Sequence, residues 1–133
     1  MLFDALNQLS SDGPLTLDVD GDCMTGSLSH GSQVQIERRR FYWPGDIVVY
    51  GRGDERLVAH RFLGYIPGRR GLCVVTRADG ATGADAPVVV GRILGKVLRV
   101  DRLPSTPSTW QRLRSIVYYL FAVTRLLLRF VFD

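Results

Sequence analysis

The chain has 133 residues, of which 46% are hydrophobic and 23% charged, so it can bury one modest core without disulfides or a structural metal. The formal charge of +4 is a mild bias, and no nucleic-acid partner is expected from it. The two cysteines, Cys23 and Cys73, lie fifty residues apart, which argues against a disulfide framework and favours a reducing compartment.

The N-terminal segment is predicted to form a short amphipathic helix. Its apolar residues recur at helical spacing at Leu2, Ala5, Leu6 and Leu9. Gly13-Pro14 ends the pattern. The stretch is too short and too polar for a signal peptide, so we expect the helix to pack on the domain.

The middle of the chain is predicted to be mostly β. Apolar and β-branched runs, separated by turns rich in glycine, proline and charge, indicate strands near 15–20, 33–37, 46–50, 57–65, 72–77 and 93–100. We therefore expect a small, mostly β domain that spans residues 1–103.

The scarcity of cysteine and histidine narrows the choice of a nucleophile and its base. Cys23 enters a glycine-rich turn, where a side chain can be presented to a substrate, whereas Cys73 lies in an apolar strand and is predicted to be a buried, small hydrophobic residue. His60 belongs to a strand that would hold its ring, whereas His30 lies in a polar turn. The sequence favours Cys23 and His60.

A thiol with an ordinary pKa is only about a few per cent thiolate at neutral pH, so it needs an imidazole within hydrogen-bond reach. The imidazole in turn needs a carboxylate that sets its tautomer. Asp79 and Asp85 follow the strand near 72–77 on a glycine-rich loop and are both eligible. Each could equally be an ordinary turn residue. No residues have metal-ligand spacing, and neither a metal nor another cofactor is expected.

Five motifs follow one another in an order that resembles the type I signal peptidase superfamily. They are Gly21-Asp22-Cys23-Met24, Gly45-Asp46-Ile47-Val48-Val49-Tyr50, His60-Arg61, the loop from Thr76 to Asp85, and Ile93-Leu94-Gly95-Lys96-Val97. The resemblance covers about residues 15–100. In the endoplasmic-reticulum and archaeal branch the base is a histidine followed by an arginine, so the resemblance implies His60 as the base.

The resemblance also assigns the remaining roles. Asp79 matches the first aspartate of the family loop and Asp85 the last, and we predict Asp85 as the residue that orients His60, with Asp79 as second choice. Cys23 stands where the family carries serine, and Gly21 replaces a serine whose hydroxyl helps to hold the oxyanion. The backbone N–H of Cys23 would therefore hold the oxyanion with less help. Met24 is expected to line the substrate pocket or the core.

Two functions are compatible with this pattern. The resemblance implies an endopeptidase that removes a leader or signal segment from a polypeptide by a Cys-His-Asp mechanism. The alternative is a catalytically inactive peptide-binding module on the same fold, because the exchanged nucleophile and the missing hydroxyl could mark a loss of catalysis.

The composition changes after Val100. Residues 104–109 are typical of a linker that ends in a helix cap, and 110–133 are predicted to form an apolar helix with arginines. Arg125 inside the apolar run would make a membrane crossing costly. Three arginines, Arg114, Arg125 and Arg129, project from one quadrant of the helix, which favours a helix lying on a membrane surface. Docking on its own domain or on a second copy in a homodimer is the alternative. We expect a cytoplasmic protein with peripheral membrane association.

Overall fold

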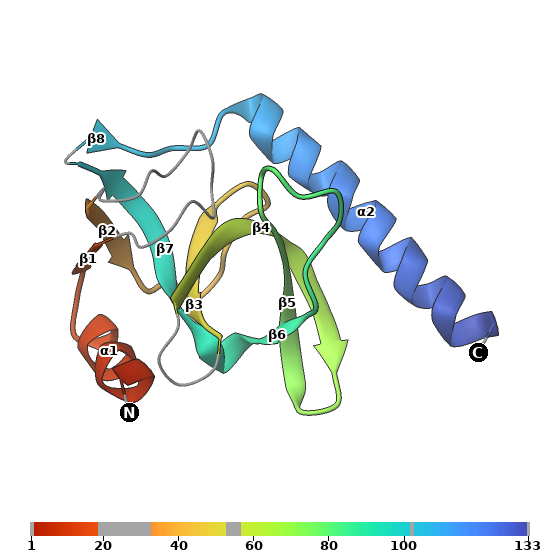
Figure 1. Ribbon diagram of the computed structural model, residues 1–133, viewed down its shortest axis with the longest axis horizontal. Helices are drawn as coiled ribbons and strands as arrows, with labels where there is room; N and C mark the ends of the chain where they lie inside the picture. The colour runs from red at the N-terminus through yellow and green to blue at the C-terminus, as the bar shows by residue number, and fades with distance from the viewer. Residues whose placement is uncertain (1, 19–32, 53–56, 102, 133) are drawn as a thin grey trace.

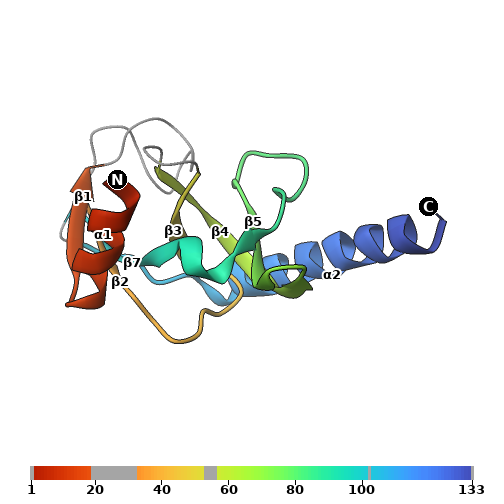
Figure 2. The same cartoon turned by 90° about the horizontal axis from the view of Figure 1, so that it is seen from below.

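The structure of the protein, a computed structural model, describes residues 2–18, 33–52, 57–101 and 103–132 (Figure 1). A curled antiparallel sheet forms the body, with a short helix at the N-terminal end and a long helix at the C-terminal end. Figure 2 shows the two helices at opposite ends of the sheet. The prediction of a mostly β fold with a helix at each end is confirmed.

The elements follow one another as α1 (Leu2–Ser11), β1 (Leu15–Asp18), β2 (Gln33–Glu37), β3 (Ile47–Gly51), β4 (Leu57–Gly68), β5 (Gly71–Arg77), β6 (Val88–Val89), a 3-10 turn η1 (Val90–Arg92), β7 (Ile93–Val100), β8 (Leu103–Pro104) and α2 (Thr109–Phe132). Each of the six strands expected from the sequence has a counterpart among them. The short strands β6 and β8 were not predicted, since two residues are too few to show a pattern.

The strand order within the described residues is β1-β2-β7-β3-β4-β5-β6, with β8 paired to β7. All pairings are antiparallel. The last long strand of the sequence, β7, lies between β2 and β3 in the middle of the sheet. The curl buries both faces of β3, whose five residues are all buried, and this explains why its sequence is a continuous apolar run rather than an alternating one.

The hydrophobic core has two parts, one on each face of β3. Ile47 and Val49 belong to one part, together with residues of β2 and β7. Val48 and Tyr50 belong to the other, which includes Phe62 and further residues of β4 and β5. This second part is the side on which the candidate site lies.

Helix α1 packs on the first part of the core through Leu6. The predicted apolar stripe is too wide, because Leu9 is 54% exposed. The helix lies at the edge of the sheet, so only part of its apolar side finds a surface to cover.

Helix α2 begins with a reciprocal cap. The Ser108 hydroxyl accepts from the Gln111 backbone N–H at 3.2 Å, and the Gln111 side chain accepts from the Ser108 N–H at 2.9 Å, which is the pattern of a capping box. Just before it, in the segment expected to be a linker, the Ser105 N–H donates to the Leu98 carbonyl at 2.8 Å. The start of that segment is therefore held against β7.

The first half of α2 docks on the domain. Arg112 donates to the Pro44 carbonyl and to the buried Asp46 carboxylate, both at 3.2 Å. One turn further on, Ser115 is buried, and beyond it the Tyr119 hydroxyl donates to the Tyr65 carbonyl at 2.5 Å. These contacts attach the helix to β4 and to the turn before β3, and its last turns extend beyond the strands (Figure 2). Among the described residues, no helix combines the length and apolarity that a membrane crossing needs.

Candidate active site

His60 is presented by the middle of β4. It pairs with Val48 of β3 in the sheet, and its strand neighbours Val58 and Phe62, two residues away on either side, belong to the core. Because alternate residues of a strand share a face, the imidazole is held among core side chains and is only 8% exposed. Its ring meets Tyr50 edge to face, with the ring centres 5.9 Å apart.

Asp85 is the carboxylate that meets this ring. Its Oδ2 lies 2.5 Å from Nδ1 of His60. Thr76, a fully buried residue near the end of β5, holds the aspartate in place twice: the Asp85 N–H donates to the Thr76 carbonyl at 2.8 Å, and the Thr76 hydroxyl donates to Asp85 Oδ2 at 3.1 Å. The loop after β5 is thereby tied to the strand beside His60.

A network of donors surrounds the pair. The Tyr50 hydroxyl lies 3.2 Å from both Nδ1 of His60 and the Thr76 hydroxyl. Burial raises the pKa of Tyr50, so its hydroxyl stays protonated and can donate to Thr76. Arg52 donates to the Tyr50 hydroxyl at 3.4 Å and lies 4.0 Å from the Asp85 carboxylate.

The electrostatics keep Asp85 ionised. Burial opposes its ionisation, but the hydrogen bond and charge of His60, the Thr76 hydroxyl and the Arg52 guanidinium outweigh that effect and lower the pKa of the carboxyl. An ionised Asp85 can only accept, which assigns the proton between the two residues to Nδ1 of His60. The other ring nitrogen, Nε2, has no hydrogen-bond partner within the described residues and is left for a reacting group.

Asp79 has a different partner. Its carboxylate binds Arg61 through two hydrogen bonds, of 3.0 Å from Nε and 2.6 Å from Nη2. The same guanidinium donates from Nη1 to the Gly45 carbonyl at 2.8 Å. Asp79 therefore links the loop after β5 to the turn before β3, and it is Asp85 that lies against His60.

Cys23 and Met24 lie outside the described residues, as does the backbone N–H of Cys23. The nucleophile, the oxyanion donor and the pocket role of Met24 stay predictions. Cys73, in contrast, is a buried, free cysteine of β5, as expected from its apolar strand. No group of three metal-ligating side chains gathers within the part of the chain that the structure describes.

Sequence reasoning did not single out Tyr50, Thr76 or Arg52 as site residues. Thr76 and Tyr50 looked like ordinary strand residues, because β-branched and aromatic side chains are what strands favour. Their position gave one usable signal, since each belongs to a motif of the resemblance and its polar atom lies in an otherwise apolar run. A buried hydroxyl in such a run needs a polar partner.

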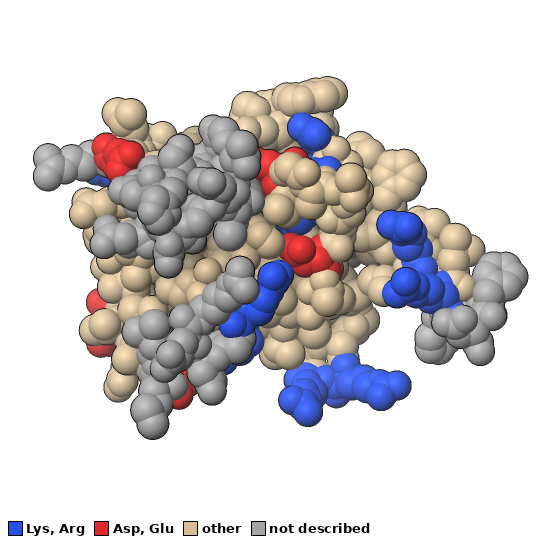
Figure 3. Space-filling model, viewed as in Figure 1, with Lys and Arg blue, Asp and Glu red and all other residues tan. Residues whose placement is uncertain are grey.

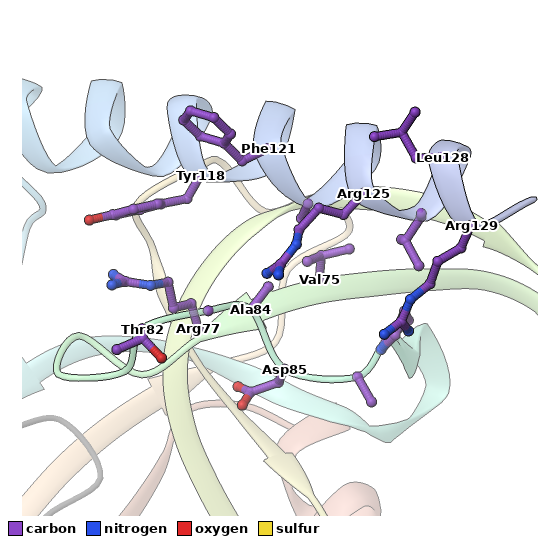
Figure 4. Close-up of a pocket in the computed structure, with 15 residues that line it drawn as sticks. Val75, Arg77, Thr82, Ala84, Asp85, Tyr118, Phe121, Arg125, Leu128 and Arg129 are labelled. Atoms are coloured by element: carbon purple, nitrogen blue, oxygen red, sulfur yellow. The ribbon is translucent and has the colours of Figure 1, made fainter. Parts of the chain in front are cut away.

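A cavity of about 700 Å³ adjoins the pair. It lies between the loop 82–87, the end of β5 and one side of α2, and Asp85 forms part of its wall (Figure 4). Cavities of this size accept drug-sized ligands or a few peptide residues.

No protein-family model matches the chain, and no curated protein is detectably similar to it in sequence.

Proposed function

We propose that the protein is an endopeptidase that removes a leader or signal segment from a polypeptide, with Cys23 as nucleophile, His60 as base and Asp85 as the residue that orients the base. The observation that supports it most directly is the His60–Asp85 hydrogen bond of 2.5 Å. It fixes a tautomer in which Nε2 can accept a proton, which is what a catalytic base needs. The order of the sequence motifs supplies the nucleophile.

The proposed reaction has two stages. Nε2 of His60 takes the thiol proton of Cys23, and the thiolate attacks the scissile carbonyl carbon to form a C–S bond. The backbone N–H of Cys23 donates to the resulting oxyanion. Collapse breaks the C–N bond while His60 gives the proton to the leaving amine. Water, activated by His60, then hydrolyses the thioester and releases the second product and the free thiol. Asp85 stays ionised throughout and stabilises the imidazolium.

A chemical test of this site needs no known substrate. Iodoacetamide should alkylate Cys23 rapidly, and His60→Ala should slow that reaction, because the imidazole would no longer promote thiolate formation. The buried Cys73 is an internal control of slow labelling in the same chain. Equal slow labelling of both cysteines would contradict an activated Cys23.

A peptide assay separates the endopeptidase from the inactive binding module. Cys23→Ala and His60→Ala should each abolish cleavage of candidate precursor peptides, measured by mass spectrometry, and the double variant should be no worse, since the two residues act as one unit. Binding of the same peptides without cleavage by the wild type would favour the binding module.

We also propose that α2 contacts an anionic membrane surface from the cytoplasmic side. Its docking leaves an apolar row exposed at helical spacing, which includes Trp110, Leu113, Val117, Leu120 and Leu127. An apolar helix face flanked by arginines is typical of helices that lie in the lipid interface. The same row could bind a second copy of the chain, which would appear as a dimer in analytical ultracentrifugation.

A further inference from the structure

The cavity beside His60 and Asp85 has a basic wall. Arg125 and Arg129 extend from α2 toward the loop 82–87, and Arg77 lines the cavity from the end of β5 (Figure 4). Among the described residues that line it, Asp85 is the one acidic residue, and its carboxylate is already bonded to His60. Basic side chains also gather beside the last turns of α2 on the molecular surface (Figure 3). The described side chains therefore give the cavity wall a net positive charge.

Two of these arginines lack a counter-ion in the described part of the chain. Neither Arg125 nor Arg129 makes an ion pair or a hydrogen bond there. They stand four residues apart on one helix, where like charges repel each other. The Arg125 guanidinium also lies close to the loop, because a β-carbon added at Gly83 would be 3.9 Å from its Nη1. Both side chains are thus placed to bind an anion that enters the cavity.

Arg77 is the third cation and is only 8% exposed. Its Nη2 donates to the Ala81 carbonyl and its guanidinium lies over the Tyr118 ring, 3.8 Å from the centre. Its Nε is buried without a hydrogen-bond partner in the described residues. A buried cation without a counter-charge is costly, and a carboxylate bound beside the Arg77 guanidinium would lower that cost.

The other groups around Tyr118 agree with a positive site. The hydrogen bond that Arg114 donates to the Tyr118 hydroxyl at 3.0 Å lowers the pKa of Tyr118, and the charge of Arg77 adds to the effect. Apart from Thr82 and Tyr118, the other side chains of the described cavity wall are apolar and include Val75, Pro87 and Leu126. The cavity has a volume of about 700 Å³ and a wall that is partly apolar and partly basic. Such a cavity fits an aliphatic chain that ends in a carboxylate better than a small inorganic anion.

We propose that this cavity binds an acidic side chain of the polypeptide substrate, through Arg125 and Arg129 on α2 and Arg77 on β5. The inference rests on the proposed peptidase function, because Asp85 belongs both to the cavity wall and to the His60 pair. We therefore expect the acidic residue of the substrate to lie within a few residues of the scissile bond. Helix α2 thereby becomes part of the substrate site.

The test uses the full chain and a mixture of peptides that carry glutamate or glutamine at each position in turn. Cleavage, measured by mass spectrometry, should favour glutamate at one position by at least about tenfold, as expected for charge-assisted hydrogen bonds. In the double variant Arg125→Gln/Arg129→Gln the ratio of cleavage of the glutamate peptide to cleavage of the glutamine peptide should fall close to one. The double variant Arg125→Lys/Arg129→Lys should restore part of this preference. Thermal unfolding of each variant checks that the fold is intact.

A matched control removes two charges elsewhere. Arg69→Gln/Arg70→Gln changes the net charge equally at the exposed turn between β4 and β5, outside the cavity wall, and should keep the preference for glutamate. A wild type that cleaves both peptides equally well would overturn the inference and leave the peptidase intact. So would loss of the preference in the control, because the effect would then be one of net charge alone.

Direct binding separates the two proposals if no peptide is cleaved. Fluorescence anisotropy with Cys23→Ala, which keeps the His60–Asp85 pair, should show that a labelled glutamate peptide binds at least about tenfold more tightly than its glutamine counterpart. This difference should disappear when Arg125→Gln/Arg129→Gln is added. Selective binding without any cleavage by the wild type would refute the peptidase and retain the carboxylate site, whereas equal binding of both peptides would refute the site.

Discussion

Gly64→Ala should destabilise the protein, because α2 crosses β4 directly over this glycine. A β-carbon on Gly64 would lie 2.5 Å from two ring carbons of Tyr119, about 1 Å inside the usual contact distance of carbon atoms. The ring is held where it is by the hydrogen bond from its hydroxyl to Tyr65. Overpacking of this kind costs about 1–3 kcal/mol. With about 2.1 cal/mol/K of unfolding entropy per residue, 133 residues convert this cost into a Tm lower by about 4–11 °C.

A double-mutant cycle isolates this contact. The free energy of unfolding would be measured by urea denaturation, followed by far-ultraviolet circular dichroism. Tyr119→Ala removes the obstructing ring, so Gly64→Ala should then cost less than about 0.5 kcal/mol, which gives a coupling of at least about 0.5 and at most about 3 kcal/mol. Tyr119→Phe keeps the ring and is the control, in which Gly64→Ala should cost as much as in the wild type.

The opposite outcome is equally clear. If the costs of Gly64→Ala and Tyr119→Ala add within about 0.5 kcal/mol, the helix does not rest on β4 at this point in solution. The basic wall of the cavity would then lose its support, because Arg125 and Arg129 are positioned by the same helix.

Three further predictions concern the site and the helix. Asp85→Asn should lower kcat/KM by about 10³-fold or more, because an amide cannot hold the His60 tautomer. Asp79→Asn should mainly lower Tm. A larger loss of kcat/KM in Asp79→Asn than in Asp85→Asn would transfer the orienting role to Asp79. The lowered pKa of Asp85 stabilises the fold above its ordinary value of 3.8 and this contribution disappears as the pH falls through the lower folded-state value. The Tm difference between wild type and Asp85→Asn should therefore shrink below about pH 4, and a difference that grows there would contradict the pairing. Leu113→Gln should weaken binding to anionic vesicles in a flotation assay without lowering Tm. Leu9→Gln is the control, because Leu9 is similarly exposed (54% against 53% for Leu113), and it should leave vesicle binding unchanged. Equal binding by the wild type and both variants would exclude the membrane contact of α2.

Much of the fold follows from local patterns in the sequence. The apolar runs of β2 to β5 and β7 were recognisable because strand alternation involves residues only a few positions apart. A helix cap at the end of 104–109 was predicted on the same kind of local pattern, and the structure places it one residue earlier, at Ser108. His60 could be chosen on similar grounds, since its neighbours Val58 and Phe62 indicated a rigid, buried strand. Local patterns thus determined the elements and one member of the candidate site.

Only the tertiary structure shows which of Asp79 and Asp85 lies against His60. The two residues have the same chemistry and lie six positions apart on one glycine-rich loop, so no local pattern separates them. The loop closes when the Asp85 N–H bonds to the Thr76 carbonyl, which brings Asp85 to His60 and leaves Asp79 to Arg61.

The orientation of α2 was likewise beyond the sequence. A helical wheel shows which residues share a side, but which side meets the domain depends on the groups that the sheet presents to it. Here Arg112 binds the buried Asp46, and the Tyr119 ring packs on the backbone at Gly64, which has no side chain. The apolar row consequently faces away from the sheet, and Arg125 and Arg129 line the cavity beside the candidate site. Such contacts join residues more than fifty positions apart, and only the folded chain brings them together.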